Sequence, residues 1–327
     1  MHSISPVLRR LARRQPGAAR DAEAWLDAAE AESLWGAVLD DAVPDLELGA
    51  LLATLALVGE SSDELLGLHR ALASRCAKWA PDIARQAVAI PVYGLFEGDA
   101  AFATLLALFL RRFDVPVVLH GPLDSPAGPS AAVLLREFGV MPSTSLREAA
   151  QILEREHIAF LPVQLLSPAL ARLLSLRARL SCCNAAHLAA MAIDPGGMGA
   201  VRIALSAPGL FGDRIAPFLQ CTEGEALLLA WPPGAVPGFG VRPRIARLNG
   251  GLEEVVFEAE TADRGAAAAW PPAANLLAWI RSVVDRRAPA PAPLVNLAAA
   301  CVHATGAAAD FTQAKAIVAL QSGRLAA

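Results

Sequence analysis

The sequence contains very little lysine. Lys78 and Lys315 are its two lysines, so arginine makes up the other 26 of its 28 basic residues. These face 32 acidic residues, which gives a formal net charge of -4. That balance excludes a protein that coats nucleic acid by bulk positive charge, but it leaves room for a local basic patch. Arginines near the start of the chain form either phosphate contacts or a solvated helix face. They are Arg9, Arg10, Arg13 and Arg14.

Long hydrophobic runs are also missing. The apolar runs 48–59 and 100–110 fall short of the roughly 20 residues that a bilayer requires, and prolines interrupt the stretch 226–241. No apolar segment of the signal-peptide kind follows the early arginines. The five cysteines lack the spacing of a metal site. We therefore expect a cytoplasmic protein with reduced thiols and no contact with a membrane.

The composition of the remaining chain indicates a large buried core. Hydrophobic residues make up 55% of the 327 positions and charged residues 18%, so the chain has about two domains or one large one. The first part, up to about residue 78, has helical periodicity throughout. Within it, Ser61 and Glu64 have the spacing of a capping box, which predicts a helix start.

The periodicity changes after Pro81. Short apolar runs at 88–92, 115–119 and 158–161 alternate with helical stretches, and further strand candidates follow at 201–205, 226–230 and 252–258. Strand, helix and strand in succession imply parallel pairing with right-handed crossovers. The sequence therefore predicts an α/β domain with helices on both faces of a central, mainly parallel sheet.

Several segments resemble anthranilate phosphoribosyltransferases, of the class III phosphoribosyltransferase fold in glycosyltransferase family 3. Four parts of the chain occur in the family's order. They are the helix 45–52 with Gly59-Glu60-Ser61, the strand and loop 115–121, the stretch 160–169 and the closing helices from 294. The resemblance implies a small helical domain, residues 1–75 with 140–185, packed on an α/β domain, residues 76–139 with 186–327. It also implies a homodimer made by the helical domain, to which the apolar stretch 46–58 contributes.

The family's phosphate-binding motifs are degenerate here. Its glycine-rich G-T-G-G-D loop is replaced by 93–99, Tyr-Gly-Leu-Phe-Glu-Gly-Asp, in which Phe96 and Glu97 crowd or repel a phosphate. Its K-H-G-N-R motif is replaced by 119–123, Leu-His-Gly-Pro-Leu, and Pro122 has no N–H to donate. The lysine and arginine that would neutralise phosphates are therefore lost from the second of these loops.

The family's substrate and metal motifs are lost as well. Cys182-Cys183-Asn184 stands where the resemblance places an arginine for the anthranilate carboxylate, and 231–234 stands where it places the D-x-x-D-E metal site. Glu223 and Glu225 either bind Mg²⁺ or are solvated turn carboxylates. This pattern is similar to a divergent branch of the family that has been associated with nucleic acids. In that branch a T-E-G-E sequence usually follows the strand, whereas here it stands at 222–225, before the strand 226–230.

We expect a cleft between the domains to hold the ligand, because ligands approach an α/β sheet at the carboxyl ends of its strands. For His120, Gly121, Asn184 and His187, structural roles in turns or helix caps remain open. Arg177 is the candidate anion contact, and no catalytic or metal-binding residue is assigned. The candidate cleft residues are Tyr93, Gly94, Gly98, His120, Gly121, Arg177, Asn184 and His187.

The leading hypothesis is a catalytically degenerate relative that binds a phosphate-containing ligand, either nucleotide-like or a nucleic acid. The alternative is an active pentosyltransferase that uses phosphoribosyl pyrophosphate, with Mg²⁺, and an altered acceptor. A purely structural or regulatory partner is a third hypothesis. None of the common hydrolase, metalloprotease or nucleotide-binding motifs is present to support another enzyme class.

Overall fold

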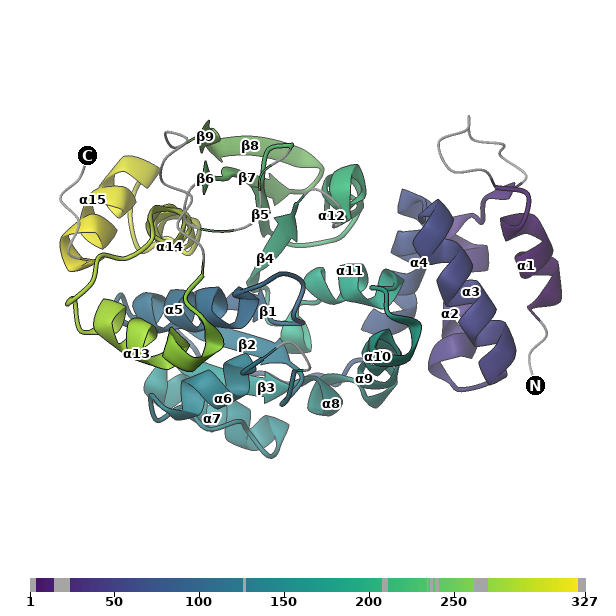
Figure 1. The fold of residues 1–327 in the computed structure, drawn as a ribbon, viewed down its shortest axis with the longest axis horizontal. Coiled ribbons are helices and arrows are strands. Elements are labelled where there is room, and N and C mark those ends of the chain that lie inside the picture. Colours follow the sequence, from purple (N-terminus) through teal and green to yellow (C-terminus); the bar gives the residue numbers. More distant parts are fainter. Residues whose placement is uncertain are drawn as a thin grey trace.

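The computed structural model describes residues 4–14, 24–125, 128–207, 211–233, 235, 238, 241–261 and 270–322. The chain begins with a helical bundle that lies at one end of the molecule (Figure 1). Capping boxes begin two of its helices. The side chains of Asp27 and Ser61 each accept a hydrogen bond from the backbone N–H three residues on, and their own backbone N–H groups donate to the carboxylates of Glu30 and Glu64. The bundle comprises α1 (Ser5–Leu11), α2 (Ala28–Leu39), α3 (Asp45–Val58) and α4 (Ser62–Ala73).

Helices α2 and α4 approach each other closely. A Cβ atom at Gly67 would lie 2.5 Å from the Cβ of Ala31, so glycine is required for this contact. Two of the early arginines hold the bundle together: Arg10 pairs with Glu30, and the buried Arg14 pairs with Glu64 and lies over the Trp25 ring. These two guanidinium groups therefore serve the bundle.

The rest of the chain is built on a seven-stranded sheet of order β3-β2-β1-β4-β5-β7-β8. Neighbours from β3 to β5 pair in parallel, whereas β7 and β8 pair antiparallel at one edge. The strands are β1 (Val88–Pro91), β2 (Val117–Gly121), β3 (Ile158–Pro162), β4 (Val201–Ser206), β5 (Ala226–Ala230), β7 (Arg244–Asn249) and β8 (Leu252–Phe257). A separate pair, β6 (Val241–Arg242) and β9 (Glu260–Thr261), lies outside this sheet.

Helices cover both faces of the sheet. Along β2, Val117 and Leu119 pack into the large core with α5, whereas Val118 packs with Leu153 of α7 in a second cluster. Alternate residues of one strand thus bury themselves on opposite faces, which is why the strands are apolar almost throughout. The helices of this part are α5 (Asp99–Arg111), α6 (Ala131–Arg136), α7 (Leu146–Glu156), α8 (Val163–Leu166), α9 (Pro168–Ser175), α10 (Arg177–Leu180), α11 (Ala185–Met191), α12 (Ile215–Gln220), α13 (Ala273–Val284), α14 (Ala292–Ala304) and α15 (Phe311–Ser322), with 3₁₀ turns η2 (Pro195–Gly197) and η3 (Gly212–Arg214).

The predicted fold class is confirmed: a small helical bundle joins a larger α/β domain with a mostly parallel sheet. Among the described helices, none is both long and apolar enough to cross a membrane. The detailed domain boundaries stay a prediction. Within the predicted return segment 140–185, β3 pairs with β2 and so belongs to the sheet, whereas Arg172 of α9 donates hydrogen bonds to the Val38 oxygen and to Asp41 at the end of α2.

An ion pair joins the two domains. Glu60 follows α3 in the bundle, and its carboxylate accepts a hydrogen bond from Arg214 of η3 in the α/β domain. Glu60 is 5% exposed, and burial raises the pKa of its carboxyl to about 7, although Arg214 opposes this shift. The contact therefore places a carboxyl that titrates near neutrality at the domain junction.

Candidate functional site

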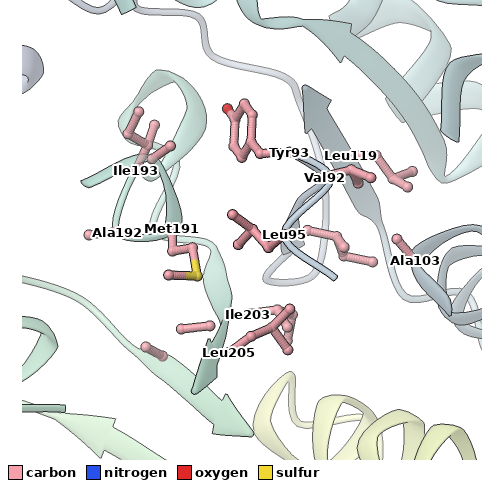
Figure 2. Packing of buried hydrophobic residues seen from close by; sticks show 14 of the residues in the cluster. Val92, Tyr93, Leu95, Ala103, Leu119, Met191, Ala192, Ile193, Ile203 and Leu205 are labelled. Atoms are coloured by element: carbon pink, nitrogen blue, oxygen red, sulfur yellow. The ribbon is translucent and has the colours of Figure 1, made fainter. Parts of the chain in front are cut away.

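A cavity of about 600 Å³ lies at the carboxyl ends of β1 and β2, enclosed by helices α8 to α11. This is where parallel α/β sheets bind their ligands. Figure 2 shows Tyr93 and Leu95, from the loop after β1, among the buried side chains that support the site, together with Met191 and Ile193 from the end of α11. Four of the eight predicted cleft residues line the cavity: Tyr93, Gly94, Arg177 and His187.

Tyr93 and His120 form a buried pair beside the cavity. The Tyr93 Oη lies 2.8 Å from Nδ1 of His120, and both side chains are almost completely buried. Burial lowers the pKa of His120 to about 3, so the imidazole is neutral, and burial raises the pKa of the Tyr93 phenol. His120 is not among the residues that line the cavity, and it acts by holding Tyr93 in place.

Arg177, the first residue of α10, anchors the loop that follows β1. Its Nη1 donates hydrogen bonds to the backbone oxygens of Gly94, at 2.7 Å, and Tyr93, at 3.3 Å. Gly94 has a φ of 65°, a left-handed conformation that glycine adopts at little cost. Arg177 is the one arginine or lysine among the described residues that line this cavity, and its Nη1 is already engaged with the loop.

Asn184 and His187 begin α11 through a capping box. The Asn184 side chain accepts from Ala186 N and donates to the Leu173 oxygen, so it serves the fold and does not line the cavity. His187 Nδ1 accepts from the Asn184 N–H, and the ring lines the cavity. Burial, and secondly the charge of Arg177, lower the pKa of His187 to about 4. His187 therefore presents a neutral imidazole to a ligand.

The glycines Gly98 and Gly121 have packing roles. A Cβ at Gly98 would lie 2.1 Å from the Cδ2 atom of Trp270, so an indole covers this position. A Cβ at Gly121 would lie 2.2 Å from the backbone oxygen of Val92, which requires glycine where β2 passes β1. Neither residue lines the cavity. Each glycine therefore makes room for another part of the protein: the Trp270 ring at Gly98 and the Val92 backbone at Gly121.

Several cavity residues were not predicted from the sequence. Small hydroxyl side chains dominate the polar part of the lining, and single serines carry no pattern that would have marked them as cavity residues. Two of them have local roles: Ser130 Oγ caps α6, and Ser175 at the end of α9 donates to the Arg172 oxygen. The polar residues missed are Asp124, Ser125, Ser130, Gln164, Ser175 and Ser181.

The Thr-Glu-Gly-Glu sequence at 222–225 forms a turn ahead of β5. The buried Arg202 donates to Thr222 Oγ1 and to the Gly224 oxygen, each at 3.0 Å. Glu225 forms a two-point ion pair with Arg247, with a shortest distance of 2.7 Å. These contacts with Arg202 and Arg247 give the residues 222–225 a structural role at the start of β5.

The carboxylates present do not suit Mg²⁺. Asp124 is the single acidic residue in the described lining of the cavity, and Glu225 is neutralised by Arg247. Within the described ranges, no three His, Cys, Asp or Glu side chains come together as a metal site would require.

Comparisons with known proteins agree with this architecture. The model of the glycosyl transferase family, helical bundle domain, matches residues 6–76. A protein named uncharacterized protein YbiB, from Escherichia coli strain K12, is 30% identical over 90% of this chain and 93% of its own length. The chain belongs to the anthranilate phosphoribosyltransferase-like family.

Other members carry the enzyme's name. An anthranilate phosphoribosyltransferase of Methylobacterium radiotolerans is 28% identical over 53% of this chain and 50% of its own. The crystal structure of anthranilate phosphoribosyltransferase (TrpD) from Thermus thermophilus superimposes with a TM-score of 0.75 at 18% identity, covering 97% of this chain and 94% of that one. This last likeness establishes the fold.

Proposed function

We propose that this family member has lost the parent transfer reaction and binds a phosphate-containing ligand in the cavity bounded by Tyr93, Gly94, Arg177 and His187. Loss of the reaction is supported by the loops after β1 and β2, 92–98 and 122–130, which contain neither lysine nor arginine. Displacement of pyrophosphate builds negative charge that needs cations or a metal ion to stabilise it. The loops supply no cationic side chain.

Binding is supported above all by the placement of Arg177. Its guanidinium is fixed by two backbone oxygens, so it is held in position before a ligand arrives. Around it the cavity offers the hydroxyl of Ser181 and the neutral ring of His187, whereas the Ser175 hydroxyl already donates to the Arg172 oxygen at 2.7 Å. One arginine with a hydroxyl donor suits one phosphate group.

The test is calorimetric titration with ribose 5-phosphate, which carries a single phosphate. We expect saturable binding that Arg177→Ala weakens at least tenfold. Arg179→Ala is the matched control, since Arg179 lies on the same short helix with a side chain that is 73% exposed and does not line the cavity. Equal binding by wild type and both variants would place the ligand elsewhere.

Two further measurements, a titration with single-stranded DNA and an assay of pyrophosphate release, distinguish the other hypotheses. Salt-sensitive binding of single-stranded DNA, without binding of ribose 5-phosphate, would make nucleic acid the ligand. Release of pyrophosphate from phosphoribosyl pyrophosphate and Mg²⁺ would support an active transferase with an altered acceptor, in keeping with relatives that carry the enzyme's name.

We also propose that the protein is a homodimer that associates through α3. Leu46 and Leu57 on this helix are 83% and 72% exposed, and Ala50 and Ala53 lie exposed between them on the same side. An apolar face of this kind is typical of an interface between subunits.

A further inference from the structure

His187 is almost completely buried, yet it leaves one ring nitrogen at the wall of the cavity. The residue is 2% exposed, and its ring lines the cavity from α11. Its Nε2 makes no hydrogen bond within the described part of the chain, and it is not sealed from solvent as Nε2 of His120 is. The cavity is the space that this ring lines, so Nε2 of His187 is the atom left for a ligand.

Asn184 determines which nitrogen of this ring carries the proton. The Asn184 N–H lies 3.3 Å from Nδ1 of His187, and a backbone N–H can only donate, so Nδ1 accepts. The Asn184 Oδ1 also lies 3.2 Å from Nδ1, but this oxygen already accepts a hydrogen bond from the Ala186 N–H. The ring is neutral, because burial and then the charge of Arg177 lower its pKa to about 4. Its single proton is therefore on Nε2.

The polar side chains that flank His187 in the chain and share its cavity are also donors. Arg177 begins α10, Ser181 follows the end of that helix, and both line the cavity with His187. Arg177 lies near enough for its charge to act on the imidazole. Arg177 and His187 can only donate, whereas the Ser181 hydroxyl can donate or accept. The segment 177–187 thus presents two obligate donors to a ligand.

We infer that His187 is a specificity-determining residue, whose Nε2–H acts with Arg177 to select a ligand group that accepts hydrogen bonds, an oxyanion, over one that donates them, an ammonium. The identification of this oxyanion as a phosphate rests on the function proposed above. The tautomer of His187 rests on its contacts with Asn184 alone. The same tautomer leaves His187 without a free lone pair, so it positions a ligand and does not act as a general base.

The first test is nuclear magnetic resonance of the full-length protein labelled with ¹⁵N-histidine. The ¹⁵N shifts of an imidazole distinguish its protonated nitrogen from the unprotonated one, and the variant His187→Asn assigns the His187 signals among the six histidines. We expect Nε2 of His187 to carry the proton at neutral pH before any ligand is added. A proton on Nδ1 overturns the inference, even if ribose 5-phosphate binds through Arg177.

The second test separates the ligand contact of His187 from its contact with Asn184. In His187→Asn, the shorter side chain places an oxygen where Nδ1 lies and can keep the bond from Asn184, but nothing reaches the position of Nε2. In His187→Gln, the longer amide places a donor near the position of Nε2 and loses the bond from Asn184. His187→Asn should bind ribose 5-phosphate about tenfold more weakly than wild type, the scale of one hydrogen bond to a charged group, whereas His187→Gln should stay within about threefold.

Thermal unfolding of the same two variants gives an independent readout. His187→Gln should lower the Tm, because it gives up the bond that closes the start of α11, and His187→Asn should leave the Tm close to that of wild type. The reverse order of affinities, with weak binding by His187→Gln and wild-type binding by His187→Asn, would show that His187 acts only through the helix cap. That result overturns the inference.

Simple ions distinguish this inference from the proposed function. Acetate should shift the Nε2–H resonance of His187 in a saturable way, and methylammonium should not. If acetate shifts the resonance and ribose 5-phosphate does not, the selection of an oxyanion stands and the phosphate-binding function fails. If neither oxyanion shifts it, or methylammonium shifts it equally, the inference is overturned. These titrations use the wild-type protein, so they decide the inference even if a variant does not fold.

Discussion

The Tyr93 hydroxyl and His120 Nδ1 lie 2.8 Å apart and are both withdrawn from solvent. Neither group has a second polar partner among the described side-chain hydrogen bonds, and Nε2 of His120 is buried without any partner in this part of the chain. The pair therefore fixes the end of β2 against the loop after β1, at the floor of the cavity.

Tyr93→Phe should destabilise the protein by about 1–3 kcal/mol, because it leaves Nδ1 of His120 buried without a hydrogen bond. Chemical denaturation measures the change. The double variant Tyr93→Phe with His120→Leu removes both partners and should lose less than the sum of the two single variants. Additive losses would show that the two side chains do not depend on each other.

Glu60 should make stability fall as the pH rises. Its pKa is raised from 4.5 to about 7 in the folded protein, so the folded state binds more protons than the unfolded state between these values. The free energy of unfolding of wild type relative to Glu60→Gln should therefore decrease between pH 4.5 and about 7, by on the order of 3 kcal/mol.

The buried histidines act in the opposite direction. Burial lowers the pKa of His69, His120 and His187, so the unfolded state binds more protons and stability is lost as the pH falls below 6.5. Both proteins share this effect, so it cancels in the difference between wild type and Glu60→Gln. Parallel stability curves for the two proteins would contradict the assignment to Glu60.

Gly121→Val should destabilise the sheet strongly, by about 3 kcal/mol or more, because the added Cβ meets a backbone oxygen that cannot move aside. Thermal unfolding measures it. Gly36→Ala in α2 is the control: its Cβ would meet only the end of the Arg75 side chain, at 3.2 Å, and a helical alanine is favourable. Equal stability of the two variants would show that β1 and β2 tolerate separation at this point.

Light scattering should give twice the monomer mass of 34.1 kDa for wild type at micromolar concentration. Leu57→Arg places a charge on the exposed face of α3 and should give the monomer. Leu252→Arg is the matched control, because Leu252 is similarly exposed, 77%, on the edge strand β8 far from α3 in the chain. A wild-type monomer would reject the proposed dimer.

Elements with local signals were predictable from the sequence. The apolar strand runs and the helix 146–156, which Ser145 caps, occur as expected. Strand β7 was missed because arginines interrupt its apolar pattern. Arg244 and Arg247 pair with Glu253 on β8 and with Glu225 in the turn before β5, partners that periodicity does not reveal.

The site was predictable to a smaller extent. Resemblance located Tyr93, Gly94, Arg177 and His187, which the fold brings to one cavity. The resemblance did not distinguish a glycine that lies against a bound phosphate from a glycine that lies against another part of the protein. Gly98 meets Trp270, which lies far along the chain, and such long-range packing has no signature in a local motif.

The ion pair between Glu60 and Arg214 limits how the two domains can be exchanged between family members. One partner lies within the segment that matches the helical bundle model, residues 6–76, and the other lies in the α/β domain. A chimera that inherits one of them leaves either a buried carboxyl or a guanidinium without its counterpart. The two domains of this protein are therefore expected to have evolved as a unit, and recombination at their boundary must preserve both residues.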